Sequence, residues 1–459
     1  MIPLPHFKAA TVGVLGLGPS GRAVVRALNE AGAKVIAWDG DETVMNSVDA
    51  HCAPINAWPY DRISTIILAD GRRAGRAQKL VERARSEDIP VLTDLDLFTD
   101  TLARLSPDER PRVVAVTGGA GKSVTASIIS HILSDLGRPT ALGGQVGQPF
   151  MALPAPTREM TYVLELPVRR LATAKSFHCN IAVIPNVAGS SAPDEIELSL
   201  KSLSRIFKPQ SKSDAVVIGV DDKLGQRLCM LLRSGQVPSA QMGAVIPVSG
   251  EASLGHGVFA IDGIASSVSR GRTAVLGDFT RAPSFAGAHF YQDAAAAIAT
   301  CLQLGVTPSL IIKALHSYGG LRGRFECIGM AGPVLFVDDS YASTVAAAQR
   351  AINACPDVFW IGARRLPAKT PIVRSSLSTV HGQYLFGALS RSVEEPTFDT
   401  LSAALAAATA DAAQLAAADS TAAPVVLFAP GARPEQSGFQ YQEFRHAAEP
   451  LMADEALYA

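Results

Sequence analysis

Short apolar runs alternate with longer helical patterns along the whole chain. The runs at 113–116, 181–184 and 425–428 are wholly apolar, as expected for strands covered on both faces of a parallel sheet. At 124–136, Ile128, Ile129, Ile132 and Leu133 recur at the spacing of one helix face. Alternation of such strands with helices predicts parallel sheets and an α/β fold.

The pattern divides into three consecutive α/β domains, in keeping with a length of 459 residues. We expect a Rossmann-like domain at 1–99, a central domain with a P-loop and a parallel sheet at 100–318, and a second Rossmann-like domain at 319–459. Two alanine-rich stretches, 294–304 and 401–418, are interpreted as helices. The first is expected to be scaffold, and the second to pack tightly on a sheet.

The stretch VVAVTGGAGKS at 113–123 has the pattern of a phosphate-binding turn between a strand and a helix. Gly118, Gly119 and Gly121 can turn backbone N–H groups around an anion at the helix N-terminus. Lys122 can reach the outer phosphates, and the Ser123 hydroxyl can ligate Mg²⁺. Only the shorter form G-x-x-G-K-S is present, and a turn that merely links strand to helix is the alternative.

A second glycine-rich turn follows the first expected strand. Gly16, Gly18 and Gly21 form G-x-G-x-x-G, and Asp39 closes the next strand. The pattern predicts a site for a nucleotide diphosphate, with Asp39 on a ribose hydroxyl. A dinucleotide site and a turn that only packs helix on strand are the alternatives.

Composition limits the kind of partner. The formal net charge is −1, so we expect neither nucleic acid nor an anionic membrane as a partner. Six scattered cysteines without a C-x-x-C pair favour reduced core residues. The N-terminus lacks the pattern of a signal peptide, and no apolar stretch is long enough for a membrane span. We therefore expect a cytoplasmic location and work on small molecules.

Taken together, the motifs resemble those of the Mur ligases, and among them most closely the ligases that add D-glutamate. VLGLGPSGRAVVRAL with VIAWD is similar to the family's uridine-diphosphate domain. VTGGAGKS stands where the family has G-T-N-G-K-[ST], GGQVG where it has G-G-N-I-G, YVLELP at the start of E-L-S-S-F, GLRGRFE where it has G-L-P-H-R-x-E, and VDDSYAST where it has N-D-S-K-A-T-N. The resemblance covers nearly the whole chain in the family's order.

The resemblance implies ATP-driven amide formation in peptidoglycan synthesis, with a UDP-muramoyl substrate, glutamate as the amino acid, and ATP and Mg²⁺ as cofactors. Two anions must meet, which requires cations to offset their charge. The implied catalytic residues are Lys122, His289 and Arg324. The implied ATP-binding residues are Gly118, Gly119, Ala120, Gly121, Lys122, Ser123, Arg324 and Asp339. The implied UDP-substrate residues are Gly16, Gly18, Gly21, Asp39 and Asn186, and the implied metal ligands are Ser123 and Glu165.

Several positions depart from the family pattern at chemically important places. Ser191 stands for a histidine that helps to hold a second metal ion, and Leu203 for a carbamylated lysine. The other substituted positions are Gly119, Ala120, Pro167, Val168, Arg169, Phe290, Asp293, Gly323, Tyr341, Pro434 and Glu435. An attenuated ligase is expected on this basis.

Two other classes of function stay open. The first is a non-catalytic paralogue that binds nucleotide or a muramoyl precursor as a regulator or scaffold. The second is a nicotinamide-dependent oxidoreductase, which rests on Gly16, Gly18 and Gly21 alone.

Overall fold

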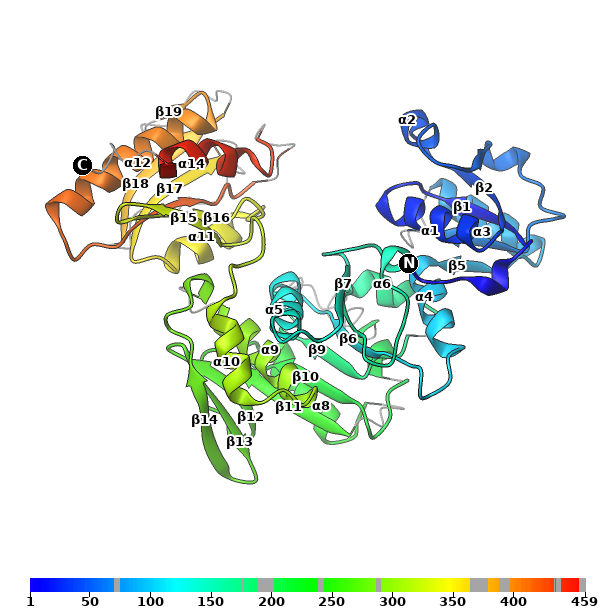
Figure 1. Cartoon of the computed structure of the whole chain (residues 1–459), viewed down its shortest axis with the longest axis horizontal. Helices are drawn as coiled ribbons and strands as arrows, with labels where there is room; N and C mark the ends of the chain where they lie inside the picture. Colours follow the sequence, from blue (N-terminus) through cyan, green and yellow to red (C-terminus); the bar gives the residue numbers. More distant parts are fainter. Residues whose placement is uncertain are drawn as a thin grey trace.

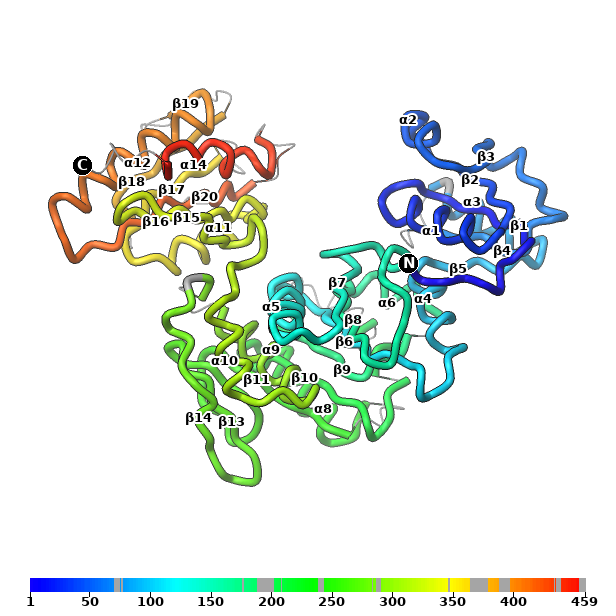
Figure 2. Tube along the Cα trace, viewed as in Figure 1, coloured from blue at the N-terminus to red at the C-terminus, as the bar shows by residue number. Residues whose placement is uncertain are grey.

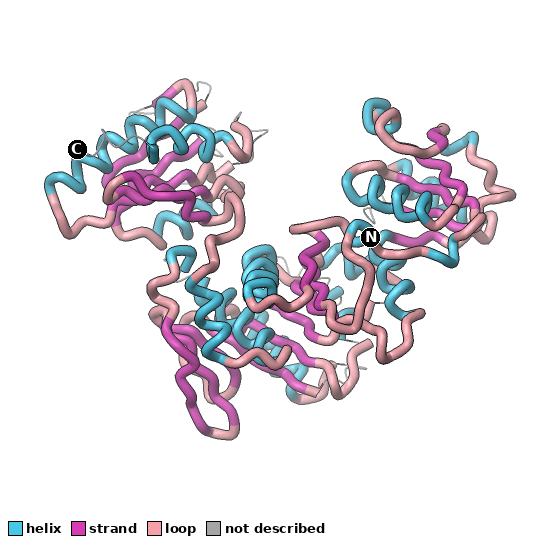
Figure 3. The backbone as a smooth tube through the Cα atoms, in the orientation of Figure 1, coloured by secondary structure: helices cyan, strands magenta, loops and turns pink. Residues whose placement is uncertain are grey.

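Three sheets follow one another along the chain, each flanked by helices (Figures 1 and 3). The computed structural model describes residues 1–69, 75–175, 177–187, 202–207, 209–237, 243–285, 290–363, 379–387, 397–432, 434 and 439–453. The Cα trace passes from an N-terminal unit through a central unit to a C-terminal unit (Figure 2). The expected fold class, three consecutive α/β units, is confirmed.

The N-terminal sheet is five-stranded and parallel, in the order β3-β2-β1-β4-β5. Its strands are β1 (Thr11–Leu15), β2 (Lys34–Trp38), β3 (His51–Cys52), β4 (Thr65–Leu68) and β5 (Val91–Thr93), and its helices are α1 (Pro19–Glu30), α2 (Glu42–Met45), α3 (Arg76–Ser86) and α4 (Asp94–Ala103). The predicted boundary at residue 99 falls inside α4, whose Phe98 ring lies 5.3 Å from that of Tyr162 in the central unit.

The central sheet has nine strands in the order β14-β13-β12-β11-β10-β9-β6-β8-β7. The strands are β6 (Arg112–Val116), β7 (Thr140–Gly144), β8 (Thr161–Glu165), β9 (Ile181–Ile184), β10 (Ala215–Gly219), β11 (Ala244–Ser249), β12 (Gly257–Ile261), β13 (Ile264–Ser269) and β14 (Arg272–Asp278). The helices are α5 (Lys122–Asp135), α6 (Val168–Thr173), α8 (Lys223–Arg233), α9 (Tyr291–Gln303) and α10 (Pro308–His316). From β7 to β12 the sheet is parallel as predicted, and an antiparallel ribbon of β12, β13 and β14 extends it.

Strand β6, which lies between β9 and β8, is buried on both faces. Val114 and Val116 pack into one apolar core with α5 and α9, whereas Val113 and Ala115 pack into another on the opposite face. Because successive side chains of a strand point to opposite faces, a wholly apolar run is what this position requires.

The C-terminal sheet has the order β15-β16-β20-β17-β18-β19, with β15 antiparallel and the remaining pairs parallel. Its strands are β15 (Glu326–Ala331), β16 (Val334–Asp338), β17 (Asp357–Ala363), β18 (Val380–Phe386), β19 (Thr397–Phe398) and β20 (Pro424–Phe428), and its helices are α11 (Val345–Asn353), α12 (Leu401–Ala418) and α14 (Glu443–Ala453).

The alanine-rich helix α12 spans the predicted residues and packs on this sheet. Contrary to the expectation that no apolar stretch is long enough for a membrane span, it is the one helix in the described ranges whose length and composition would allow it to cross a membrane. Leu401, Leu405 and Ala408 are buried in the core of the C-terminal unit, and Leu415 packs against that core. The apolar composition of α12 therefore serves a close approach to strands β17, β18 and β20.

A buried ion pair joins the N-terminal and central units. The Arg170 guanidinium in α6 donates to Asp94 Oδ1 at 2.5 Å, and Asp94 is only 1% exposed. Burial raises the pKa of Asp94 to about 6 against the lowering effect of Arg170. Such a pair is costly to break, because the remaining charge would stay buried without its partner.

Candidate functional site

The glycine-rich turn between β6 and α5 is closely packed by its neighbours. Gly118 has φ +109°, and a Cβ there would lie 2.3 Å from the Asn186 carbonyl oxygen. Gly121 has φ +81°, and a Cβ there would lie 2.1 Å from Asp293 Oδ1. Only glycine fits these two positions without displacing a neighbour. Gly121 at the N-cap has no side chain that could cap α5, so the backbone N–H groups in the first turn of the helix are available to an anion.

The predicted metal ligands lie in contact beside this turn. Ser123 Oγ donates to Glu165 Oε2 at 2.9 Å, and Glu165, the last residue of β8, is 2% exposed. Burial raises the pKa of Glu165, while Ser123, Lys122 and Arg324 each lower it by a smaller amount. The structure therefore brings a hydroxyl and a carboxylate together next to the turn.

Lys122 lies half-buried at the start of α5, and its ammonium donates to the Gly119 carbonyl oxygen of its own turn. Burial lowers the pKa of Lys122, with Glu165 acting in the opposite direction. The ammonium is therefore held over the turn by a neutral acceptor and faces a carboxylate nearby.

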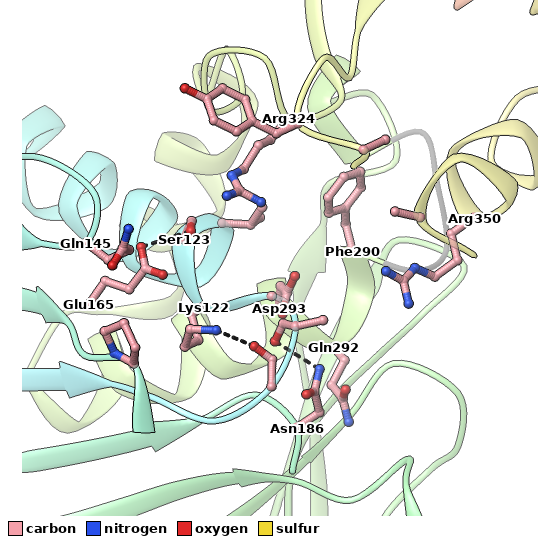
Figure 4. Close-up of a pocket in the computed structure, with 18 of the residues that line it drawn as sticks. Lys122, Ser123, Gln145, Glu165, Asn186, Phe290, Gln292, Asp293, Arg324 and Arg350 are labelled. Carbon is pink, nitrogen blue, oxygen red and sulfur yellow. Dashed lines mark hydrogen bonds between the residues drawn. The ribbon is translucent and has the colours of Figure 1, made fainter. Parts of the chain in front are cut away.

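A pocket of about 490 Å³ opens above the turn (Figure 4). The predicted residues that line it are Gly119, Ala120, Gly121, Lys122, Ser123, Glu165, Asn186, Arg324 and Asp339. Gly118 lies in the turn but is not among the lining residues. Residues far apart in the sequence, from both the central and the C-terminal unit, thus share one cavity.

The C-terminal unit contributes Arg324 and Asp339 to this pocket. The Arg324 guanidinium lies 5.0 Å from the centre of the Tyr341 ring. Asp339, which follows β16, accepts a hydrogen bond from the Phe325 N–H at 3.0 Å. Burial raises the pKa of Asp339 to about 7, with Phe325 and Arg324 acting in the opposite direction.

Asn186 was predicted to bind the UDP substrate, but it lies in the pocket beside the phosphate turn. Its side-chain Nδ2 donates to the Ala120 carbonyl oxygen at 2.9 Å, and its backbone carbonyl oxygen accepts from the Gly119 N–H at 3.0 Å. Asn186 therefore braces the turn, and its contact with the UDP substrate stays a prediction.

Other pocket residues were not among the predicted site residues. Asp293 lies in the first turn of α9, and its Oδ1 accepts from Thr125 Oγ1 at 3.1 Å. Burial raises the pKa of Asp293 to about 7. The remaining additions include Gln145, Arg169, Gln292, Tyr341 and Arg350. The sequence contains one feature that could have pointed to Arg350 as a site residue: it is the single cationic residue in the alanine-rich stretch at 344–354.

The N-terminal glycine turn lies in a different sheet from this pocket. Gly16 has φ +89°, and a Cβ at Gly21 would lie 1.8 Å from the Gly16 carbonyl oxygen. Asp39 accepts from the Leu17 N–H at 2.5 Å and closes the turn, whereas a Cβ at Gly18 would meet open space. Backbone conformation and packing explain why glycine is required at positions 16 and 21. The binding of a diphosphate at this turn stays a prediction.

Some predicted positions are not part of the described pocket. His289, Ser191 and Glu435 lie outside the described residues. Leu203 is 1% exposed and packs in the apolar core with Ile206 and Phe207. The position aligned with the family's lysine is therefore a core position in this chain. In the described ranges, no group of three or more His, Cys, Asp or Glu residues could hold a metal ion.

Comparisons with known proteins point to one family, although no protein-family model matches the chain. UDP-N-acetylmuramoylalanine--D-glutamate ligase of Phenylobacterium zucineum is 33% identical over 372 residues, covering 79% of this chain and 77% of that protein. The ligase of that name from Roseobacter denitrificans is 31% identical over 475 residues, covering 100% of both chains.

Solved structures share the fold. MurF from Acinetobacter baumannii has a TM-score of 0.54 at 17% identity, covering 99% of this chain and 93% of that chain. MurF ligase from Thermotoga maritima, solved in complex with ADP, has a TM-score of 0.53 at 18% identity, covering 99% of this chain and 98% of that chain. Together with the full-length sequence similarity, these findings show that the chain belongs to the Mur ligases, in the family of the UDP-N-acetylmuramoylalanine--D-glutamate ligases.

Proposed function

We propose that the protein is an ATP-dependent ligase that joins glutamate to a UDP-N-acetylmuramoyl-L-alanine precursor in peptidoglycan synthesis. The observation that carries this proposal is the shared pocket, in which Arg324 and Asp339 of the C-terminal unit face the phosphate turn of the central unit. A cavity lined from two units suits a reaction that brings separate substrates together. A cytoplasmic location belongs to the same proposal, since ATP is available there.

The proposed reaction proceeds in two displacements. A carboxylate oxygen of the muramoyl substrate attacks the γ-phosphorus of ATP, and the bond to ADP breaks. The amine of glutamate then attacks the activated carbonyl carbon, so that a C–N bond forms, phosphate leaves and the amine loses a proton. Lys122 and Arg324 would offset the negative charge of the approaching anions.

The residues at the turn fit both proposed cofactors. Uncapped N–H groups at the start of α5, together with Lys122, suit a polyphosphate. The Ser123 hydroxyl and the Glu165 carboxylate, 2.9 Å apart, are the hard oxygen ligands that Mg²⁺ prefers and would hold it. Bound there, the ion supplies positive charge to the phosphates.

We further propose that the N-terminal unit binds the UDP moiety through Gly16, Gly18, Gly21 and Asp39, and that domain boundaries lie near residues 99 and 318. Turnover is proposed to be attenuated, because Leu203 is a core residue and cannot be carbamylated. The same observation favours a second candidate, a non-catalytic paralogue that binds nucleotide or the muramoyl precursor.

One experiment separates the two candidates. Purified protein would be supplied with ATP, Mg²⁺, UDP-N-acetylmuramoyl-L-alanine and either D- or L-glutamate, and nucleotide binding, phosphate release and the amide product would be measured. A Lys122→Ala variant serves as the background, because it removes the cation that faces the phosphates. Product above that background supports the ligase. Nucleotide binding without product supports the non-catalytic paralogue.

A further inference from the structure

A chain of ring contacts leads from the pocket to an exposed tyrosine. The Arg324 guanidinium lies 5.0 Å from the centre of the Tyr341 ring, and the Tyr341 and Tyr441 rings are stacked at 4.2 Å with an interplanar angle of 8°. Tyr341 is 41% exposed and Tyr441 is 37% exposed. Two large rings are therefore partly exposed to solvent, and one of them contacts Arg324, a cationic residue of the pocket.

The backbone around Tyr341 holds its ring in place. The Tyr341 N–H donates to the Gly323 carbonyl oxygen at 3.0 Å, and Ser340 Oγ donates to the Tyr441 carbonyl oxygen at 3.3 Å. Gly323 has φ +66°, and a Cβ there would lie 2.9 Å from the Tyr341 ring. Gly323 and Tyr341 both depart from the family pattern, and the Tyr341 ring occupies space that a side chain at position 323 would need.

Arg324 depends on this arrangement for its position. Within the part of the chain that the structure describes, its guanidinium makes no ion pair and no hydrogen bond, whereas it does lie over the Tyr341 ring. The guanidinium lies close enough to act electrostatically on both Lys122 and Glu165. Its donors are therefore free to face the phosphate turn, as Figure 4 shows for Arg324 above Ser123.

We propose that Tyr341, supported by Tyr441, is a positioning residue that orients the Arg324 guanidinium toward the phosphates bound at the turn. The inference rests on the proposed function and deepens it. A cation over the face of an aromatic ring is attracted by the ring's charge distribution. An arginine held in this way keeps all its donors for an anion, whereas a free arginine would first have to be ordered.

The test compares Tyr341→Leu with Tyr341→Phe, each alone and combined with Arg324→Ala. Tyr341→Leu removes the ring, and we expect kcat to fall about tenfold, because a misplaced cation stabilises the transferring phosphoryl group poorly. The nucleotide Kd, measured with a fluorescent ATP analogue, should rise only about two- to fivefold. Tyr341→Phe keeps the ring and should restore both values. In the Arg324→Ala background, Tyr341→Leu should have no further effect.

A matched control is available in the N-terminal unit. The Arg83 guanidinium lies over the Tyr60 ring, also at 5.0 Å, outside the pocket. Tyr60→Leu removes the same kind of contact and should leave the nucleotide Kd unchanged. Circular dichroism would verify that every variant is folded.

Two results would overturn the inference. The first is an additive loss from Tyr341→Leu in the Arg324→Ala background, because the ring would then act independently of the cation. The second is a Tyr341→Phe variant as impaired as Tyr341→Leu. If the wild-type protein forms no amide, the proposed function fails, but the coupling of Tyr341 and Arg324 in nucleotide Kd still decides the positioning role.

Discussion

Replacing Asp293 with asparagine tests the electrostatics beneath the phosphate turn. Asp293 is 6% exposed, and its carboxylate packs against Gly121 and accepts from Thr125. Asparagine has nearly the same shape, and its carbonyl oxygen can accept the same hydrogen bond. The substitution therefore removes the charge with little change in packing.

The sign of the expected effect follows from the raised pKa. Burial raises the pKa of Asp293 from 3.8 to about 7, so the folded protein retains a proton that the unfolded chain loses. Wild-type stability therefore falls as the pH rises from about 4 to about 7, and the loss is complete above that range. A shift of about three pKa units corresponds to about 4 kcal/mol. Asp293→Asn should regain a stability of this order at about pH 8 and almost nothing at about pH 4.

The measurement must report on the central unit, because the three tryptophans, Trp38, Trp58 and Trp360, lie in the other two units. Hydrogen exchange of the α5 and α9 amides, corrected for intrinsic rates, gives the opening free energy of this region. Comparing variant with wild type cancels other groups that titrate in the same range, such as Asp339.

Equal gains at about pH 4 and about pH 8 would refute the reasoning, because they would show that the substitution acts through packing rather than charge. Asp278→Asn provides a contrast of opposite sign. Hydrogen bonds from Thr280 lower the pKa of the exposed Asp278, so this variant should lose stability above about pH 4 and show no effect in more acidic solution.

Two further predictions concern the phosphate turn and the buried ion pair between the N-terminal and central units. Gly121→Ala should abolish nucleotide binding in a fluorescence titration, because its Cβ would lie 2.1 Å from Asp293 Oδ1 at a φ of +81°; unchanged affinity would contradict the described turn. Arg170→Met should lower the free energy of unfolding by about 3–5 kcal/mol near neutral pH, because it leaves Asp94 buried without its partner. Urea unfolding followed by tryptophan fluorescence measures this loss, which Asp94→Asn in the same chain should largely reverse.

The elements that carry the phosphate turn could be predicted because their signals are local. The apolar run of β6, the glycines and the periodicity of α5 lie within one continuous stretch, and all three appear as expected. The antiparallel ribbon was missed, since β14 is mostly exposed and lacks an apolar pattern. Strand β14 is stabilised by pairing with β13 rather than by burial.

The assembly of the site was harder to predict, because its members meet only in the folded chain. Asp293 and Thr125 are 168 positions apart. The alanine-rich stretch after Asp293 was expected to be scaffold, and α9 is indeed packed in the core, but its first turn also lines the pocket. The stacking of Tyr341 on Tyr441 likewise depends on how the last helix returns to β16, which no local pattern shows.

The hydrogen bond from Lys122 to its own turn has a consequence for ligand choice. The ammonium donates one of its three N–H groups to the Gly119 carbonyl oxygen, so an incoming group competes with water for the other two. The net gain is the difference between the bond to the ligand and the bond to water that it replaces. A neutral acceptor gains almost nothing in this exchange, whereas a charged phosphate oxygen gains the surplus of a charge-assisted bond. The turn thus discriminates by ligand charge before any contact with base or sugar is made.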